Sequence, residues 1–389
     1  DEDEDITNDF YIVLALFFIK RNCYLKEREK MKAAVCREYK KPLTIEEVTL
    51  CDPNENEIEV TLKASAICHS DISSMDGIWQ DKIPAIYGHE ASGIITKIGS
   101  KVKHLNLGEK VLVTLIRSCK VCSACIDSDP TSCNFTWDDE YTPLSNHKGE
   151  KFVRGIKVGA FAEKVIVQES HCVKLPDDIP FEIASLLACG VITGFGAVSN
   201  TAGLSKGQTA MVFGCGGVGL NALQGAKMRK AAKIIAVDIS EKKLDIAKTF
   251  GATDCLHGGE KNLLEEVMKL TKGEGVDYVF ITVGVGQLFK DALKYLKKGG
   301  SAILVGMPPS KDSLIPYDVL DIAGNNISIK GSKMGQSMIE RDIPMLIELW
   351  RSGNFKLEEL ISGRYSLENI NEAINETRRG DAKRNVVIF

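Results

Sequence analysis

Four cysteines stand close together in this chain, at Cys119, Cys122, Cys125 and Cys133. Two successive C-x2-C steps and a fourth thiol supply four sulfur ligands, which are enough to close a tetrahedral shell around one zinc ion. A shell of four thiolates leaves no open coordination position, so such an ion would stabilise a loop and take no part in catalysis. The alternative is a pair of disulfides, which the lack of a secretory signal in the sequence disfavours.

A second set of metal-binding side chains comes from three separate segments. They are Cys68-His69-Ser70-Asp71, Gly88-His89-Glu90 and Cys189-Gly190. Two sulfurs, one imidazole nitrogen and a free fourth position are typical of a catalytic zinc, so Cys68, His89 and Cys189 are the predicted ligands. Taken singly, the neighbouring residues have simpler interpretations, with His69 as a surface histidine, Ser70 as a loop hydroxyl and Asp71 as a turn residue.

A glycine-rich loop predicts a dinucleotide site. Gly214, Gly216, Gly217, Val218 and Gly219 lie between an apolar strand expected at 210–213 and a helix expected at 218–229. The glycines allow a tight turn and let a pyrophosphate approach the helix N-terminus closely.

The residues after the glycine loop favour NAD over NADP. A strand expected at 234–237 ends in Asp238, nineteen residues after the last glycine. This carboxylate would accept hydrogen bonds from the ribose hydroxyls and repel a 2′-phosphate. Lys243 would reach the same ribose. The simpler alternatives are a helix cap for Asp238 and a solvated helix lysine for Lys243.

The elements that must position these residues fall into two halves. Residues 31–175 contain short strands broken by Gly and Pro, expected at 31–36, 58–66, 91–98, 111–116 and 161–167, as in a small irregular β-barrel. After residue 191, strands and helices alternate, which predicts an α/β, doubly wound Rossmann domain with a six-stranded parallel sheet. Helices at 338–351 and 367–378 and a strand at 385–389 complete the predicted elements.

Composition is that of an ordinary two-domain globular protein. The chain has 389 residues, 44% hydrophobic and 26% charged, with a net charge of −4 and no long basic run, so no nucleic-acid or anionic-membrane partner is expected. Residues 1–30 are expected to be an N-terminal extension outside the fold. Their apolar run at 10–19 is too short to cross a bilayer, although a weak membrane or partner anchor is the alternative. A cytoplasmic location is expected.

The order of these motifs resembles the zinc-dependent medium-chain alcohol dehydrogenases, and among them a bacterial branch grouped with the class III enzymes. The matching segments are Cys68-His-Ser-Asp, Gly88-His-Glu, the four-cysteine cluster, Leu187-Ala-Cys-Gly-Val-Ile-Thr-Gly and Gly214-Cys-Gly-Gly-Val-Gly. The resemblance implies a GroES-like catalytic domain at 31–190, a Rossmann NAD domain at 191–333 and a C-terminal segment, 334–389, that completes the catalytic domain. It also implies two zinc ions per chain, NAD as cofactor, and a homodimer, with a homotetramer as the alternative.

The same resemblance implies roles for single residues. Asp71 would support a zinc ligand, Glu90 would approach the metal transiently, and His69 and Arg384 would face the cofactor pyrophosphate. Ser70 would take the alcohol proton as a primary alcohol becomes an aldehyde, by hydride transfer from a zinc alkoxide to NAD. Many relatives carry a histidine three residues beyond that hydroxyl, where this chain has Ser73.

Two tryptophans bear on the substrate. Trp79 and Trp137 stand where enzymes that oxidise S-(hydroxymethyl)glutathione carry charged residues. We therefore expect Trp79, Leu115 and Ile156 to line an apolar pocket for a small alcohol or aldehyde. The alternatives are S-(hydroxymethyl)glutathione dehydrogenase, a noncatalytic NAD-binding relative, and a polyol dehydrogenase, which the thiol of Cys189 disfavours.

Overall fold

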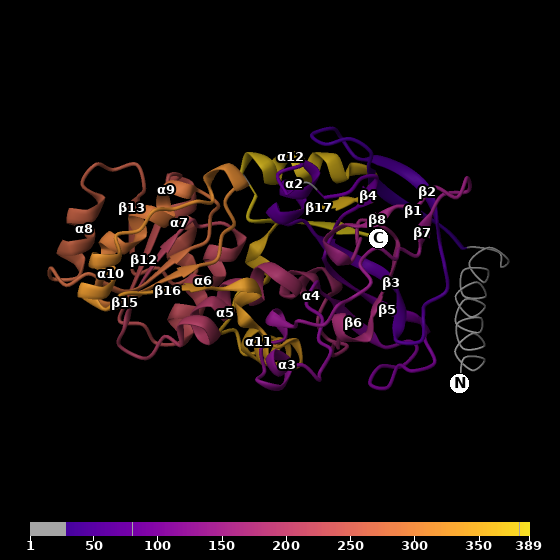
Figure 1. The fold of residues 1–389 in the computed structure, drawn as a ribbon, viewed down its shortest axis with the longest axis horizontal. Coiled ribbons are helices and arrows are strands. Elements are labelled where there is room, and N and C mark those ends of the chain that lie inside the picture. The colour runs from indigo at the N-terminus through magenta and orange to yellow at the C-terminus, as the bar shows by residue number, and fades with distance from the viewer. Residues whose placement is uncertain (1–28, 80, 381) are drawn as a thin grey trace, which may run out of the picture.

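Two parts make up the molecule, a β-rich part and a Rossmann-type part, drawn at the right and left of Figure 1. The computed structural model describes residues 29–389 except Gln80 and Asp381. The expected N-terminal extension lies, up to residue 28, outside the described residues. The C-terminal segment, yellow in Figure 1, returns from the Rossmann part to the β-rich part.

The β-rich part contains two sheets. The five-stranded sheet has the order β7-β2-β1-β4-β8. Its strands are β1 (Glu29–Cys36), β2 (Thr44–Leu50), β4 (Ala85–Ile86), β7 (Leu144–Ser145) and β8 (Val153–Arg154). The seven-stranded sheet has the order β10-β6-β5-β3-β18-β17, with β9 also paired to β3. Its strands are β3 (Glu57–Ala66), β5 (Glu90–Ile98), β6 (Lys110–Val113), β9 (Lys164–Gln168), β10 (Cys172–Lys174), β17 (Ile361–Ser366) and β18 (Arg384–Ile388).

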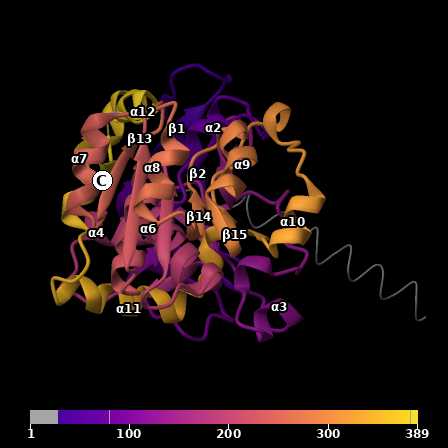
Figure 2. The ribbon, with the colours of Figure 1, turned by 90° about the vertical axis from the view of Figure 1, so that its left-hand side faces the viewer.

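The Rossmann part is a parallel six-stranded sheet in the order β13-β12-β11-β14-β15-β16. Its strands are β11 (Thr209–Phe213), β12 (Lys233–Asp238), β13 (Asp254–His257), β14 (Val276–Ile281), β15 (Leu296–Leu304) and β16 (Ser328–Gly331). The helices that follow them include α6 (Gly217–Met228), α7 (Glu241–Thr249), α8 (Leu263–Leu270), α9 (Gly286–Asp291) and α10 (Val319–Asn325), seen around the strands in Figure 2.

Alternation along β11 explains why both faces of this sheet are covered. Ala210 and Val212 lie in one buried cluster with side chains of α6 and α7. Met211 and Phe213 lie in another with side chains of α8 and α9. A strand apolar on both faces needs helices on both sides. The order of strands reverses at β11, which places a crevice at its carboxyl end.

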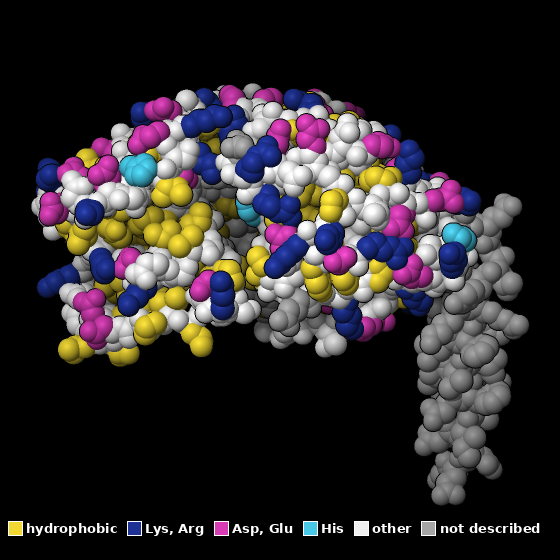
Figure 3. Space-filling model, turned by 90° about the horizontal axis from the view of Figure 1, so that it is seen from above, with side chains coloured by type: hydrophobic (Ala, Val, Ile, Leu, Met, Phe, Trp, Pro, Cys, Tyr) yellow, Lys and Arg dark blue, Asp and Glu magenta, His cyan; other side chains and the backbone are white. Residues whose placement is uncertain are grey.

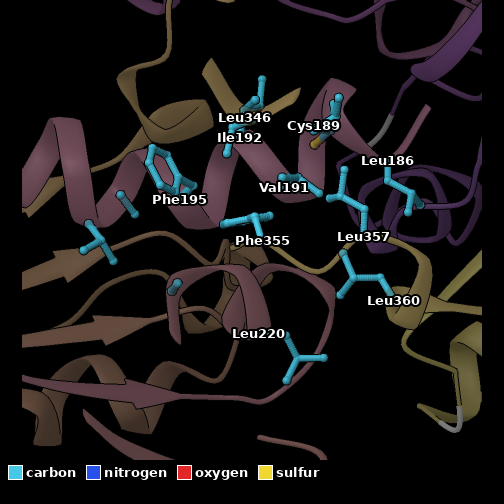
Figure 4. Close-up of a cluster of buried hydrophobic side chains, with 14 of the residues drawn as sticks. Leu186, Cys189, Val191, Ile192, Phe195, Leu220, Leu346, Phe355, Leu357 and Leu360 are labelled. Carbon is cyan, nitrogen blue, oxygen red and sulfur yellow. The ribbon is translucent and has the colours of Figure 1, made fainter. Parts of the chain in front are cut away.

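A long apolar helix joins the two parts. Residues Phe181–Ala202 run through α4 (Phe181–Leu186), a π-helical turn (Leu187–Val191), α5 (Ile192–Gly196) and a second π-helical turn (Ala197–Ala202). Among the described residues it is the one helix long and apolar enough to span a membrane, but 89% of its most apolar window is buried inside the protein. Figure 4 shows its side chains packed against those of Phe355, Leu357 and Leu360 from the C-terminal segment. We interpret it as a core helix.

The predicted two-part α/β fold is confirmed, with differences at the ends of elements. The predicted strand at 111–116 ends at Val113, and the one at 161–167 begins at Lys164. The helices α11 (Ile339–Arg351) and α12 (Ile370–Arg379) occupy the last stretch as expected. The domain limits stay a prediction, and the apolar helix crosses residue 190.

Candidate active site and zinc centres

One buried cluster of metal-binding atoms lies where the β-rich part meets the apolar helix. Cys68 precedes α2 (His69–Met75), His89 and Glu90 stand at the start of β5, and Cys189 lies in the π-helical turn. The candidate ligand atoms of these four residues all lie within 4.8 Å of one another. The structure therefore brings together the three predicted ligands and adds the carboxylate of Glu90.

Asp71 orients two members of this cluster from a fully buried position. Its Oδ1 accepts hydrogen bonds from His89 Nδ1 and from the Gly88 amide, both at 2.9 Å. Its Oδ2 accepts one from the Cys68 amide at 3.1 Å. With Nδ1 engaged, His89 Nε2 is buried without a hydrogen-bond partner. An orphaned imidazole nitrogen between two thiols fits a zinc ion, and the carboxylate–histidine pair is the usual support for one.

Charge in the cluster favours an anionic sulfur. A hydrogen bond with Cys189 lowers the pKa of the Cys68 thiol well below its ordinary value despite burial, and the same bond raises the pKa of Cys189. Burial opposes protonation of His89, but the negative charge of Asp71 outweighs it and raises the pKa of the imidazole. A metal ion and a proton therefore compete for this histidine.

The four-cysteine lobe forms a second centre around α3 (Ser123–Ile126). The sulfurs of Cys119, Cys122, Cys125 and Cys133 lie within 4.8 Å of one another, and all four are free thiols, not disulfides. A hydrogen bond from the Asn134 amide lowers the pKa of Cys122 to about 6. The Cys119 sulfur accepts a hydrogen bond from the Cys122 amide at 3.3 Å. Four clustered sulfurs with amide donors fit a closed zinc shell.

The remaining described cysteines divide into packing thiols and one exception. Cys36, Cys172, Cys215 and Cys255 are free and buried or half-buried, as packing thiols are expected to be. Cys51 differs from these four, because it forms a disulfide.

In the glycine loop between β11 and α6, only one glycine has open space where a Cβ would stand. A Cβ on Gly219 would lie 1.8 Å from the Gly214 carbonyl oxygen, and Gly214 itself has φ +92°. A Cβ on Gly216 would meet nothing within 4 Å. Gly217 begins α6, and Val218 follows it in the first turn. The open space at Gly216, beside a helix N-terminus, is the cradle in which a pyrophosphate fits.

Asp238 ends β12 and also supports this loop. Its Oδ2 accepts a hydrogen bond from the Cys215 amide at 2.8 Å, and its Oδ1 accepts one from the Ser240 amide at 3.0 Å. Asp238 does not cap α7, because Ser240 is the residue at the N-cap and, among the described residues, no side chain bonds to the first amides of the helix. Lys243 lies in the first turn of α7, half-buried.

Arg384 connects the cofactor loop with the metal cluster. Its Nη2 forms an ion pair with Glu90 Oε1 at 2.5 Å. A Cβ on Gly190 would lie 2.0 Å from its Nη1, and a Cβ on Gly217 would lie 2.5 Å from its Cδ. The Arg384 side chain therefore occupies the space that a Cβ on either glycine would take. Desolvation lowers the pKa of His69, and the positive charges of Arg384 and Lys243 lower it further, although the residue itself is exposed.

The remaining predicted residues lie around this centre in different ways. Ser70, half-buried, follows His69 in α2, and Ser73 lies one turn further on. Trp79, Leu115 and Ile156 are all half-buried and come from separate segments. Ile156 packs on the core of the five-stranded sheet, and Leu115 packs on the cores beside the apolar helix and the seven-stranded sheet. Figure 3 shows a hollow between the two parts, with apolar side chains gathered on its Rossmann wall.

Sequence reasoning missed Met334. Its Sδ lies 3.7 Å from Cys189 Sγ and 3.6 Å from Thr193 Oγ1. Thr193 stands one helical turn after Cys189, a spacing that would have marked it as a neighbour. Nothing in the sequence around Met334 marks it, since no metal-binding or periodic pattern surrounds it.

Two family models and several known proteins match this chain. A model described as "Zinc-binding dehydrogenase" matches residues 217–351, and one described as "Alcohol dehydrogenase GroES-like domain" matches 54–177. The chain is 33% identical over 373 residues to an S-(hydroxymethyl)glutathione dehydrogenase of Saccharomyces cerevisiae, covering 92% of this chain and 96% of that protein. It is 32% identical to an NDMA-dependent alcohol dehydrogenase of Amycolatopsis methanolica, covering 92% and 99%.

Solved structures agree with these relatives. The benzyl alcohol dehydrogenase of Acinetobacter calcoaceticus superposes with a TM-score of 0.86 at 28% identity, covering 93% of this chain and 99% of that one. An alcohol dehydrogenase zinc-binding domain protein from Burkholderia ambifaria gives 0.88 at 28% identity, covering 93% and 100%. The resemblance found in the sequence is confirmed: this chain is an oxidoreductase that belongs to the zinc-binding, medium-chain alcohol dehydrogenase family.

Proposed function

We propose that this protein oxidises a primary alcohol to an aldehyde, and catalyses the reverse reaction, with zinc at Cys68, His89 and Cys189 and with NAD at the glycine loop. The observation that supports this most is the position of Arg384. Its side chain contacts Glu90 at the zinc site and Gly217 at the glycine loop. Zinc, when bound, supplies a Lewis acid that makes an alcohol oxygen more acidic. NAD supplies the hydride acceptor.

The chain's own residues bind and orient the reactants. Gly216 leaves room for the pyrophosphate, and Arg384 and His69 present positive charge or hydrogen-bond donors to it. Asp238 accepts hydrogen bonds from the adenosine ribose, and Lys243 reaches the same ribose. Ser70 takes up the alcohol proton at its Oγ. Ser73 stands where many relatives carry a histidine, so the proton leaves through water, Ser73 or another base.

The cationic side chains near the pocket support a simple alcohol over a glutathione adduct. The two terminal nitrogens of Arg117, Nη1 and Nη2, donate hydrogen bonds to the Asp139 carboxylate, at 2.6 and 2.7 Å. The Cζ atom of Arg117 lies 4.9 Å from the Trp137 ring centroid. Arg154 is engaged by Glu57 and by the Ile166 carbonyl. Neither arginine is free to hold a glutathione carboxylate. Trp79, Leu115 and Ile156 instead present apolar surface to the substrate.

A substrate panel tests this proposal. Ethanol, benzyl alcohol and formaldehyde, the last with and without glutathione, are assayed with NAD after zinc is counted by elemental analysis. Two zinc ions per chain and glutathione-independent turnover of the alcohols are expected. Turnover of formaldehyde only with glutathione would favour the second candidate, S-(hydroxymethyl)glutathione dehydrogenase, which is the activity named for the yeast relative. Zinc-loaded protein without turnover would contradict both.

A homodimer is the proposed assembly, and a homotetramer its alternative. Strand β16 is at the edge of the Rossmann sheet, and exposed apolar side chains surround it. Val285, Met307, Leu314, Val319 and Leu320 are between 52% and 91% exposed. A second copy would cover this surface and pair with the edge strand. Sedimentation of wild type as a dimer and of Leu320→Glu as a monomer is expected. We propose a cytoplasmic location, where the metal-binding thiols stay reduced.

A further inference from the structure

Three consecutive residues after β16 adopt the left-handed backbone conformation. Met334 has φ +50°, Gly335 has φ +66° and Gln336 has φ +48°. Glycine adopts this conformation readily, but methionine and glutamine do so at a cost in free energy. Such strain persists only where the surroundings hold the backbone in place, and it is concentrated at functional sites.

The surroundings of this left-handed run are unusually restrictive. Gly335 lies against the apolar helix so closely that a Cβ would stand 2.5 Å from the Ile192 carbonyl oxygen. The amide nitrogen of the Asn200 side chain donates hydrogen bonds to the Gly335 and Gln336 carbonyls, at 3.2 and 3.4 Å, and to Asp342 at 3.1 Å. Asp342 is buried and is paired with Arg341. The apolar helix Phe181–Ala202 and α11 together hold the run in place.

This conformation delivers the Met334 thioether to the metal cluster. The run leaves the Rossmann sheet at the carboxyl end of β16, which is the edge where such sheets bind dinucleotides. Met334 Sδ lies 3.7 Å from Cys189 Sγ, and the side chain is buried. Met334 therefore stands between the cofactor edge of the sheet and a predicted ligand of the catalytic zinc.

We infer that Met334 is a specificity-determining residue, whose side chain limits the bulk of the group carried by the reacting carbon. This rests on the proposed function. Because Met334 Sδ lies 3.7 Å from Cys189 Sγ on the cofactor side of the cluster, we place the substituents of an alcohol bound at the metal beside this thioether. Methionine fills irregular space and adapts to it, which suits unbranched alcohols. A shorter side chain leaves space for a branch at the next carbon.

The test compares four variants with wild type. Met334→Asn shortens the side chain with a residue that tolerates the left-handed conformation, and Met334→Ala shortens it further. Met334→Leu keeps the volume, and Met345→Ala, on the exposed side of α11, is the matched control. The ratio of kcat/KM for 2-methylpropan-1-ol to that for ethanol is measured. We expect this ratio to rise about tenfold for Met334→Asn and Met334→Ala. We expect little change in the ratio for Met334→Leu and Met345→Ala.

A second readout does not depend on turnover. With Co²⁺ in place of zinc, the cobalt–thiolate absorption reports on the surroundings of Cys189. Met334→Asn is expected to shift this band, and Met345→Ala is not. An active wild type whose alcohol ratio is unchanged in folded, metal-loaded Met334→Asn overturns the inference. If wild type oxidises no alcohol but the cobalt band of Met334→Asn is shifted from that of wild type, the proposed function is refuted while Met334 is still shown to lie beside the metal. If the band of Met334→Asn is unshifted, Met334 does not lie beside the metal.

Discussion

Glu90 and Arg384 form an ion pair in the interior, with side chains 0% and 6% exposed. Glu90 begins β5 and Arg384 begins β18, two strands that flank β3 in the seven-stranded sheet. Burial raises the pKa of Glu90 to about 7, although the charge of Arg384 opposes this rise. The pair joins the metal cluster to the cofactor loop, so we expect both stability and cofactor binding to depend on it.

Replacing Arg384 with leucine leaves a buried carboxylate unpaired. We expect the free energy of unfolding to fall by about 3–5 kcal/mol, and NAD affinity to fall as well. Urea denaturation and NADH titration by protein fluorescence measure the two effects. The double variant Glu90→Gln/Arg384→Leu is expected to recover stability but not NADH affinity. Recovery of both would show that Arg384 does not touch the cofactor.

Two glycines of the cofactor loop offer a matched pair of alanine substitutions. Gly219→Ala places a methyl group 1.8 Å from the Gly214 carbonyl oxygen, whereas Gly216→Ala places one in open space. Gly219→Ala is therefore expected to lower the melting temperature, because backbone must move. Gly216→Ala is expected to keep the wild-type melting temperature and to lose NADH affinity at least about tenfold, which is about 1.4 kcal/mol. Tight NADH binding by Gly216→Ala would place the pyrophosphate elsewhere.

Asp71 is expected to control the occupancy of one zinc centre alone. Asp71→Asn weakens the support of His89, so metal affinity at that cluster should fall by about 10–100-fold. After dialysis against EDTA, elemental analysis should give one zinc per chain, held by the four-cysteine lobe. Asp76→Asn is the control, because Asp76 lies at the end of the same helix and is paired with Arg378 at the surface. This variant should keep two zinc ions per chain. Equal losses in both variants would contradict the assignment.

Acid should destabilise the protein through His171. This residue is buried, with Nδ1 2.8 Å from the Thr114 carbonyl oxygen, and burial lowers its pKa to about 3. The unfolded chain takes up a proton below about pH 6.5 while the folded protein does not, so stability falls as the pH drops from about 6.5 towards 3. The limiting slope is about 1.4 kcal/mol per pH unit.

Urea midpoints at pH 7 and pH 5 measure this slope. His171→Gln should lower stability at pH 7 and reduce the difference between the two midpoints. His147, which lies exposed on a loop, is the matched control, and His147→Gln should leave the difference as it is in wild type. An unchanged difference in His171→Gln would show that other groups take up the acid protons.

Residues whose chemistry dictates their type were predictable from the sequence. Cysteines and a histidine at ligand spacing, and glycines where a Cβ has no room, are restricted by bonds and contacts that few residue types satisfy. The apolar helix Phe181–Ala202 was not predicted, because a helix buried on all sides has no periodic pattern. Met334 and Asn200 were missed for another reason. Their roles arise from a left-handed backbone that neighbouring elements impose, and no local signal encodes it.

The place of β18 in the sheet has a consequence for biogenesis. This strand pairs antiparallel with β3 and parallel with β17, yet it is formed by residues Arg384–Ile388, which are synthesised after all the strands of the Rossmann sheet. Residues 209–331, which carry all six strands of the Rossmann sheet, emerge from the ribosome earlier and can pair while translation continues. The seven-stranded sheet stays incomplete until β18 has emerged, so a nascent chain is expected to acquire its dinucleotide loop before its metal-binding pocket.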